Sequence, residues 1–245
     1  MKIAIISDLH SNIEALQACL RKTKALNVEQ YVCLGDMIGY GPDPVATLET
    51  VMSLPNVVVI RGNHEEALFG AYYKGLRSHV RQSIDWTKTQ LSPAHLDYVQ
   101  SLPYQQTVQG ASMVHATADQ PERWAYLHSI SLAERCMQAA GTVLTFIGHT
   151  HQPQVFLKVP GKDTVCLAAS PEKALPIDPQ CRYVINVGSV GQPRDENNKA
   201  SFAVYDSEQN EVMFYRIDYD YEQTARKIIA QGLPALFAER LKVGH

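Results

Sequence analysis

The sequence lacks the features that mark several large classes of protein. It has no run of Lys or Arg, and its formal net charge is −3, so nothing in it indicates a surface for long nucleic acids. Its five cysteines are scattered, without a CxxC pair, which is typical of free thiols in a reducing compartment. The chain also has no low-complexity stretch, no repeat and no linker that would require a domain boundary.

Long hydrophobic runs are missing too. The apolar run in the opening MKIAIISDLH lasts four residues before Ser7 and Asp8, which is too short for a signal peptide or a membrane span. The 245 residues are 45% hydrophobic and 19% charged, as in an ordinary globular protein with a sizeable core. We predict a soluble cytoplasmic protein with one domain over residues 1–245 and no membrane partner. The oligomeric state stays open, a homo-oligomer included.

The first part of the chain alternates between strand and helix patterns. Apolar segments at 2–7, 30–34 and 56–60 have the composition of buried strands, and segments 11–26 and 43–54 between them have helical spacing. Ser11 and Glu14 have the spacing of a capping box at the start of the first helix. This alternation predicts βαβ units and a mostly parallel sheet.

The rest of the chain has a different pattern. Residues 66–101 have a helical pattern, and the tail 221–241 is an amphipathic helix by its spacing. Between them we predict strands at 104–109, 111–115, 142–148, 153–159, 164–168, 182–188, 200–206 and 211–217.

Five of the apolar strands run directly into polar side chains, usually beside a glycine. The segments are SDLH, GDM, RGNHE, MVHA and GHTH, and they supply Asp8, His10, Asp36, Asn63, His64, His115, His149 and His151. In open α/β sheets, ligands bind outside the carboxyl ends of the strands. We therefore expect these side chains to surround one depression.

The residue types indicate a metal site. Oxygen and imidazole ligands without thiolate suit Mn, Fe, Zn or similar divalent ions. Asp8 and His10, like His149 and His151, would each share one face of an extended chain. Asp36 can bridge two ions, and the HxH pair can give one imidazole to each. Two ions about 3.5–4 Å apart are the usual arrangement for phosphoryl chemistry, and their positive charge favours an anionic substrate.

Together the five motifs resemble the calcineurin-like metallophosphoesterase superfamily, whose order is D-x-H, G-D, G-N-H-[DE], H and G-H-x-H. All five occur in that order between residues 8 and 151, and the later NVGSVGQPRD (186–195) resembles the small bacterial and archaeal branch. The resemblance leaves out 66–101, expected to be a helical insertion, and the tail. It implies a four-layer α/β/β/α sandwich of two mixed sheets. We expect the alternating first half to build one sheet and the strand-rich second half the other.

The resemblance also implies roles for the motif residues. One metal would take Asp8, His10, Asp36 and His151, and the other Asp36, Asn63, His115 and His149. His64 would contact phosphate and assist the leaving group without binding metal. Asn63 would also lie against the substrate.

Three further side chains have two interpretations each. Arg194 either contacts phosphate or is a loop cation paired with Asp195. Trp124 and Tyr126 either stack on an aromatic part of the substrate or pack structurally.

The implied activity is hydrolysis of a small phosphate ester by a hydroxide activated at two divalent ions, with Mn²⁺ as the first choice and Fe, Zn, Ni or Co as alternatives. The resemblance to the small branch of the family implies phosphodiester substrates. Phosphomonoesters or phosphoproteins are alternative substrates, and a non-catalytic scaffold of the same fold is an alternative function. Loss of catalysis would be expected to damage a motif residue, and all are intact here. The sequence therefore favours an enzyme.

Overall fold

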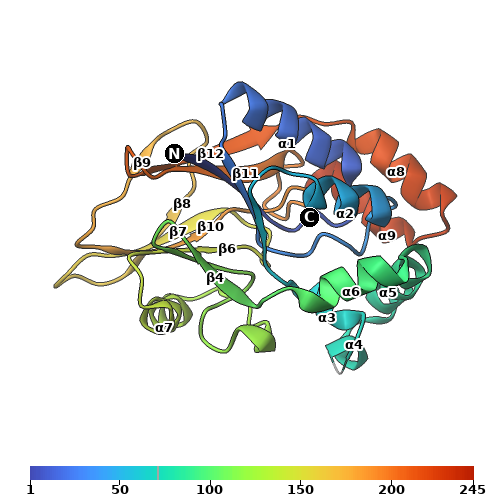
Figure 1. Cartoon of the computed structure of the whole chain (residues 1–245), viewed down its shortest axis with the longest axis horizontal. Helices are drawn as coiled ribbons and strands as arrows, with labels where there is room; N and C mark the ends of the chain where they lie inside the picture. Colours follow the sequence, from blue (N-terminus) through green and yellow to red (C-terminus); the bar gives the residue numbers. More distant parts are fainter. Residues whose placement is uncertain (71) are drawn as a thin grey trace.

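The computed structural model describes residues 1–70 and 72–245. Two six-stranded mixed sheets pack face to face, with helices on both outer surfaces (Figure 1). This confirms the predicted α/β/β/α sandwich. Within the described residues, no helix combines the length and the apolar character needed to cross a membrane.

The first sheet has the order β3-β2-β1-β11-β12-β9. β1, β2 and β3 run parallel, and β11 pairs antiparallel with β1. The strands are β1 (Lys2–Ile6), β2 (Gln30–Cys33), β3 (Val57–Val59), β9 (Leu175–Pro176), β11 (Ala200–Asp206) and β12 (Glu211–Ile217). The expectation that only the first half builds this sheet is wrong, because β9, β11 and β12 belong to it. β1 is buried along four of its five residues, and the hairpin of β11 and β12 supplies the partner on its second edge.

The second sheet has the order β4-β5-β6-β10-β7-β8. β6 runs parallel to both β5 and β10. The strands are β4 (Gln105–Val108), β5 (Ala111–Val114), β6 (Leu144–Ile147), β7 (Gln154–Lys158), β8 (Val165–Ala168) and β10 (Arg182–Asn186). Each sheet thus contains one parallel triplet of strands.

The main core lies between the two sheets. Ile5 and Val32 of the first sheet pack in one cluster with Phe146 and Ile185 of the second, all of them fully buried. On the outside, α1 (Ile13–Ala25) and α2 (Pro44–Met52) cover the first sheet, and α7 (Ile130–Ala140) covers the second.

Residues 66–101 are mostly helical, as predicted, with short turns between the helices; Ala71 lies outside the described residues. The helices in and around this stretch are α3 (Asn63–Ala67), α4 (Tyr72–Gly75), α5 (Ser78–Gln90) and α6 (Pro93–Ser101). The tail is not one helix. It divides into α8 (Tyr221–Ala230) and α9 (Ala235–Val243), because Gly232 adopts a φ of +70° and Pro234 follows it.

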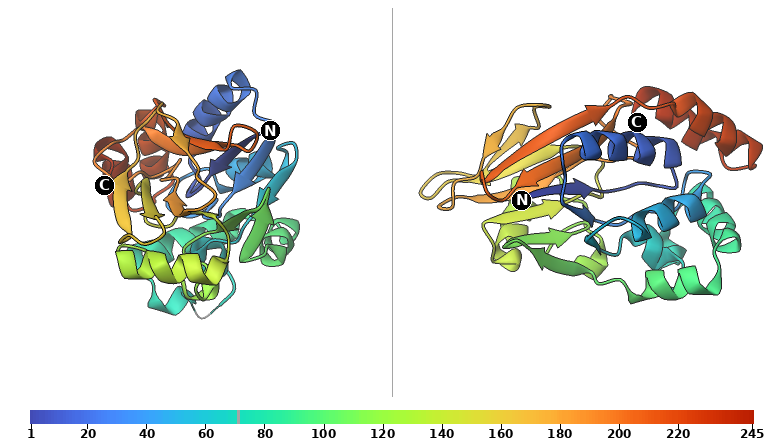
Figure 2. Two further views of the ribbon diagram at one scale, coloured as in Figure 1. Left: turned by 90° about the vertical axis from the view of Figure 1, so that its left-hand side faces the viewer. Right: turned by 45° about the horizontal axis from the view of Figure 1, so that its top comes forward.

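The start of α1 also differs from the expectation. Its N-cap is Asn12, whose side-chain oxygen accepts a hydrogen bond from the backbone N–H of Ala15 at 3.1 Å. Glu14 does not close a capping box. Its carboxylate accepts hydrogen bonds from Thr224 and Lys227 of α8. These contacts hold the C-terminal helices beside α1 (Figure 2, right).

Candidate metal centre

The polar residues at the five strand ends lie together, as the sequence predicts. All eight are buried, and none exposes more than 4% of its surface. Seven of them form three overlapping groups in which the side-chain ligand atoms lie within 4.8 Å of one another. The groups are Asp8, His10 and His151; His10, Asp36 and His64; and Asp36, His115 and His149.

The local backbone is not extended. Asp8, His10, Asp36, His149 and His151 all have positive φ values, between 46° and 66°. The expected extended backbone is therefore wrong, although Asp8 and His10 do enter one group as expected. The chain turns sharply after the strands, and the two residues of the HxH pair enter different groups. Such φ values are uncommon for residues other than glycine and cluster at functional sites.

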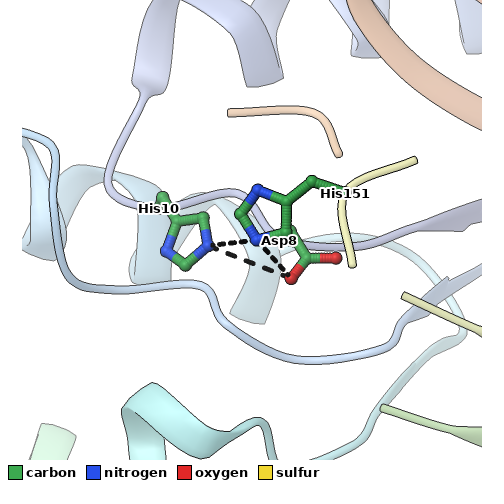
Figure 3. Close-up of side chains that lie close together, drawn as sticks. All are labelled: Asp8, His10 and His151. Atoms are coloured by element: carbon green, nitrogen blue, oxygen red, sulfur yellow. Dashed lines mark hydrogen bonds and ion pairs between the residues drawn. The ribbon is translucent and has the colours of Figure 1, made fainter. Parts of the chain in front are cut away.

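In the first group two imidazoles face each other across an aspartate (Figure 3). Nε2 of His10 lies 3.2 Å from Nε2 of His151, and Oδ1 of Asp8 lies 3.2 Å from the latter atom. The outer Nδ1 atoms lie 3.1 Å from the carbonyl oxygen of Ile38 and 2.6 Å from that of Gln192. A carbonyl only accepts, so each outer nitrogen carries the proton. Each inner nitrogen is left with a lone pair.

The group of Asp36, His115 and His149 repeats this arrangement. Nε2 of His115 lies 3.1 Å from Nδ1 of His149. The outer nitrogens of these two rings donate to the carbonyl oxygens of Leu34, at 2.9 Å, and Trp124, at 3.0 Å. Oδ1 of Asn63, another acceptor, lies 3.1 Å from the inner nitrogen of His115. When both rings are neutral, the lone pairs of the two inner nitrogens again face one another.

These contacts between acceptors fit a metal ion in each group. Burying several lone pairs and carboxylates close together raises the free energy of the fold unless a cation binds to them. Oδ1 of Asp8 is buried, and no hydrogen-bond donor meets it in the described part of the chain. Imidazoles whose outer N–H groups are held by carbonyls are typical metal ligands. The residues present therefore suit divalent cations.

The pKa values of the histidines also favour a bound cation. Burial lowers the pKa of His10 and His151, and it lowers that of His149 to about 3, so these rings are neutral. Burial also lowers the pKa of His115, but the negative charges of Asp36 and Asp8 have the larger effect and raise it to about 9. The carboxylates thus attract positive charge to the space between the rings.

Asp36 lies between the groups. Its Oδ2 is 3.7 Å from Nε2 of His10 and 3.5 Å from Nε2 of His115. Its Oδ1 accepts a hydrogen bond from the backbone N–H of His64 at 2.8 Å. The same single oxygen therefore faces both groups.

His64 reaches the centre from α3. Its Nε2 lies 4.0 Å from Oδ2 of Asp36, and its Nδ1 is buried, with no hydrogen-bond partner among the described residues. Burial lowers the pKa of His64 to about 4, and the charge of Arg194 acts in the same direction. A neutral ring with a free polar atom is thereby held at the edge of the centre.

Arg194 lies at the same edge. Its guanidinium carbon is 5.7 Å from the centre of the Tyr40 ring, and that ring packs on His10 at 4.5 Å and on His64 at 4.4 Å. The interpretation of Arg194 as the partner of Asp195 is wrong, because Asp195 pairs with Arg216. Arg194 instead donates to Oε1 of Gln192 at 2.9 Å.

The two aromatic residues after His115 behave differently. Trp124 is buried and packs on His115 with ring centres 5.8 Å apart, and its carbonyl fixes the proton of His149. Its structural interpretation is confirmed. Tyr126 is 47% exposed and stacks on His149 with ring centres 4.0 Å apart, so its outer face is accessible.

Sequence reasoning gave no role to Glu65. This buried carboxylate accepts backbone N–H groups from Asp36 at 2.7 Å, Met37 at 2.8 Å and Gly62 at 2.8 Å. Burial and the charge of Asp36 raise the pKa of Glu65 to about 7, while the backbone donors oppose this. Glu65 thus joins the loop of Asp36 to the start of α3. A sequence signal existed, because Glu65 stands three residues after the N-cap Gly62, as in a capping box.

We expect Glu65→Gln to weaken metal binding about 10- to 100-fold and to destabilise the fold by about 2–3 kcal/mol. The amide keeps the size of the side chain but turns an N–H₂ group toward backbone donors. Metal titration and thermal unfolding would measure the two effects. Glu49→Gln, on the exposed side of α2, is the matched control and should change neither. Normal metal affinity in Glu65→Gln would show that the carboxylate does not position the centre.

The comparisons with known proteins agree with this geometry. The family model of the calcineurin-like phosphoesterase superfamily domain matches residues 1–210. The chain therefore belongs to this family, and it is a metallophosphoesterase.

Its relatives are similar along their whole length. A metallophosphoesterase from Sphaerobacter thermophilus is 33% identical, with a TM-score of 0.88, and the match covers 100% of this chain and 99% of that one. A hypothetical protein from Pyrococcus horikoshii OT3 is 22% identical, with a TM-score of 0.82 over 100% of this chain and 98% of that one; this likeness concerns the fold. An uncharacterized protein of Methanocaldococcus jannaschii is 33% identical over 99% of this chain and 98% of its own length.

Proposed function

We propose that this metallophosphoesterase hydrolyses small phosphodiesters at a centre of two divalent ions. The observation that carries the proposal is the pair of facing imidazoles in each of two groups, with one oxygen of Asp36 directed at both. Asp8, His10 and His151 would hold one ion. Asn63, His115 and His149 would hold the other, and Asp36 would serve both.

The ions would polarise the phosphoryl oxygens and lower the pKa of a water molecule to near neutrality. The residues of the chain would orient the metal ligands and bind the substrate. The carbonyls of Leu34, Ile38, Trp124 and Gln192 keep the imidazole lone pairs directed inward. Arg194 would bind a phosphate oxygen through its guanidinium group. His64, beside Asp36, would contact the phosphate and donate to the departing oxygen.

The substrate preference and the metal are inferred from the sequence and the ligand types. The preference for diesters follows from the resemblance of NVGSVGQPRD to the small branch of the family. Mn²⁺ is the first choice because oxygen and imidazole ligands suit it, and Fe, Zn, Ni or Co fit the same donors. The cytoplasmic location stays a prediction from the scattered cysteines.

A paired substrate screen tests the proposal. With Mn²⁺ supplied, we expect bis(p-nitrophenyl) phosphate to be hydrolysed with a kcat/KM at least about 10-fold higher than that of p-nitrophenyl phosphate, a difference of about 1.4 kcal/mol in transition-state binding. A chelator should abolish both activities, and added metal should restore them. A preference for the monoester would replace the diester assignment, and activity that survives chelation would contradict the metal centre.

A further inference from the structure

The segments that carry none of the family motifs meet at Tyr40. One face of its ring packs on His10, and the ring also packs on Phe237 of α9, with ring centres 4.8 Å apart. A small hydrophobic cluster joins Tyr40 to α5, α8 and α9 through Val80, Ile228, Leu233, Phe237 and Leu241. Helices from 66–101 and from the tail are thereby fixed directly beside the metal centre.

These helices bring arginines to the same place. Arg240 follows Phe237 by three residues on α9, and residues three apart lie on one face of a helix. Arg77 is the N-cap of α5, and His79, two residues later, packs on Phe237 with ring centres 5.7 Å apart.

The end of α9 is also tied to the loop of Arg194. The backbone N–H of Glu196 donates to the carbonyl oxygen of Gly244 at 2.9 Å. Arg194 itself lies over the Tyr40 ring. Arg194 therefore lies at the contact between Tyr40 and α9, with Arg240 on α9 and Arg77 at the start of α5 nearby.

The positive charges of this cluster are not balanced. Among residues 1–70 and 72–245, no carboxylate forms an ion pair with Arg77, Arg194 or Arg240. Burial lowers the pKa of Arg240, and the guanidinium groups of Arg194 and Arg77 lower it further. Nε of Arg194 is buried without a hydrogen-bond partner in the same part of the chain. Arg194 and Arg240 are half-buried and Arg77 is exposed, and neighbouring cations that repel one another are stabilised by a bound anion.

We infer that Arg240 and Arg77, next to Arg194, form a second anion subsite that takes a phosphate group carried by the substrate in addition to the reacting phosphate. The inference rests on the proposed function. A phosphodiester carries one negative charge, which the metal centre and Arg194 already meet. Guanidinium groups bind phosphate through paired hydrogen bonds, so a second phosphate is the group that this cluster suits.

Matched chromogenic substrates test the subsite. One is a p-nitrophenyl alkyl diester whose alkyl arm ends in a phosphate, and the other ends in a hydroxyl, with arms of two, four and six carbons. The reacting phosphate and the leaving group are identical, so the ratio of their kcat/KM values reports the terminal phosphate alone.

In the wild-type protein we expect this ratio to be about 10 or more at the best arm length and to fall with added salt. Arg240→Gln should bring the ratio close to one, and Arg77→Gln should lower it. Arg226→Gln, an exposed residue of α8 that pairs with Glu222, is the control and should keep the wild-type ratio. A wild-type ratio near one at every length, or an unchanged ratio in Arg240→Gln, would overturn the inference.

A binding measurement separates this inference from the proposed function. Calorimetry on the Mn²⁺-loaded protein compares 1,4-butanebisphosphonate with butylphosphonate, neither of which is hydrolysed. Tighter binding of the bisphosphonate that depends on Arg240, without turnover of either diester, would keep the subsite and reject the activity. Turnover of both diesters with no preference for the bisphosphonate would keep the activity and reject the subsite.

Discussion

Asp36→Ala is expected to lose both metal ions and to reduce hydrolysis by at least about 10³-fold. One oxygen of Asp36 faces both imidazole groups, and the other accepts the backbone N–H of His64. Oδ1 of Asp8 also approaches both groups, at 3.2 Å from Nε2 of His151 and 4.0 Å from Nε2 of His115, but Asp36 in addition accepts a hydrogen bond from α3. Elemental analysis of protein purified without chelator, with kcat/KM measured on the same samples, would detect the loss.

Two variants separate the bridge from simple unfolding. Asp36→Asn keeps the acceptor for the His64 N–H but removes the charge, so it should remain folded while it binds metal weakly. Asp97→Ala, on the exposed side of α6, should behave as the wild type. Two bound ions in Asp36→Ala would rule out the bridging role.

His64→Ala is expected to lower kcat by about 10²- to 10⁴-fold on an ester with a poor leaving group, while metal content stays normal. The loss should be much smaller on a nitrophenyl ester, because nitrophenolate leaves without a proton. The free, buried Nδ1 and the distance of 4.0 Å from Nε2 to Asp36 place the ring beside the centre without a fixed partner.

The measurement is kcat on an alkyl and an aryl diester, with metal analysis in parallel. His95→Ala, which removes a histidine of α6 outside the centre, is the control. Equal losses on the two esters would assign His64 to phosphate binding alone. Loss of metal would make His64 a ligand, which its proximity to His10 and Asp36 allows.

The sequence predicted which polar residues gather at this site because four of the five motifs follow strands that are mostly buried. The strand ends of β1, β2, β5 and β6 are short-range features, and the polar residues after them are visible in the chain order. The family resemblance then supplied the two-sheet architecture. Positions 8, 36, 115 and 149 needed no tertiary information to be chosen.

The features that the sequence could not predict depend on contacts between residues far apart in the chain. Strand periodicity says nothing about which sheet a strand joins, so the antiparallel pairing of β11 with β1 could not be foreseen. The carbonyls that fix the imidazoles come from the backbone of Leu34, Ile38, Trp124 and Gln192, and a backbone carbonyl has no sequence signature. The packing of Tyr40 between His10 and Phe237 likewise joins residues far apart in the chain.

We propose that four imidazoles, fixed by backbone carbonyls, direct lone pairs at two metal ions that share Asp36. A crystal grown with Mn²⁺ and measured on both sides of the manganese absorption edge tests it directly. We expect two anomalous peaks, one among Asp8, His10 and His151 and one among Asn63, His115 and His149, with Oδ2 of Asp36 in contact with both. A single peak, or two peaks without a contact to Asp36, would contradict it.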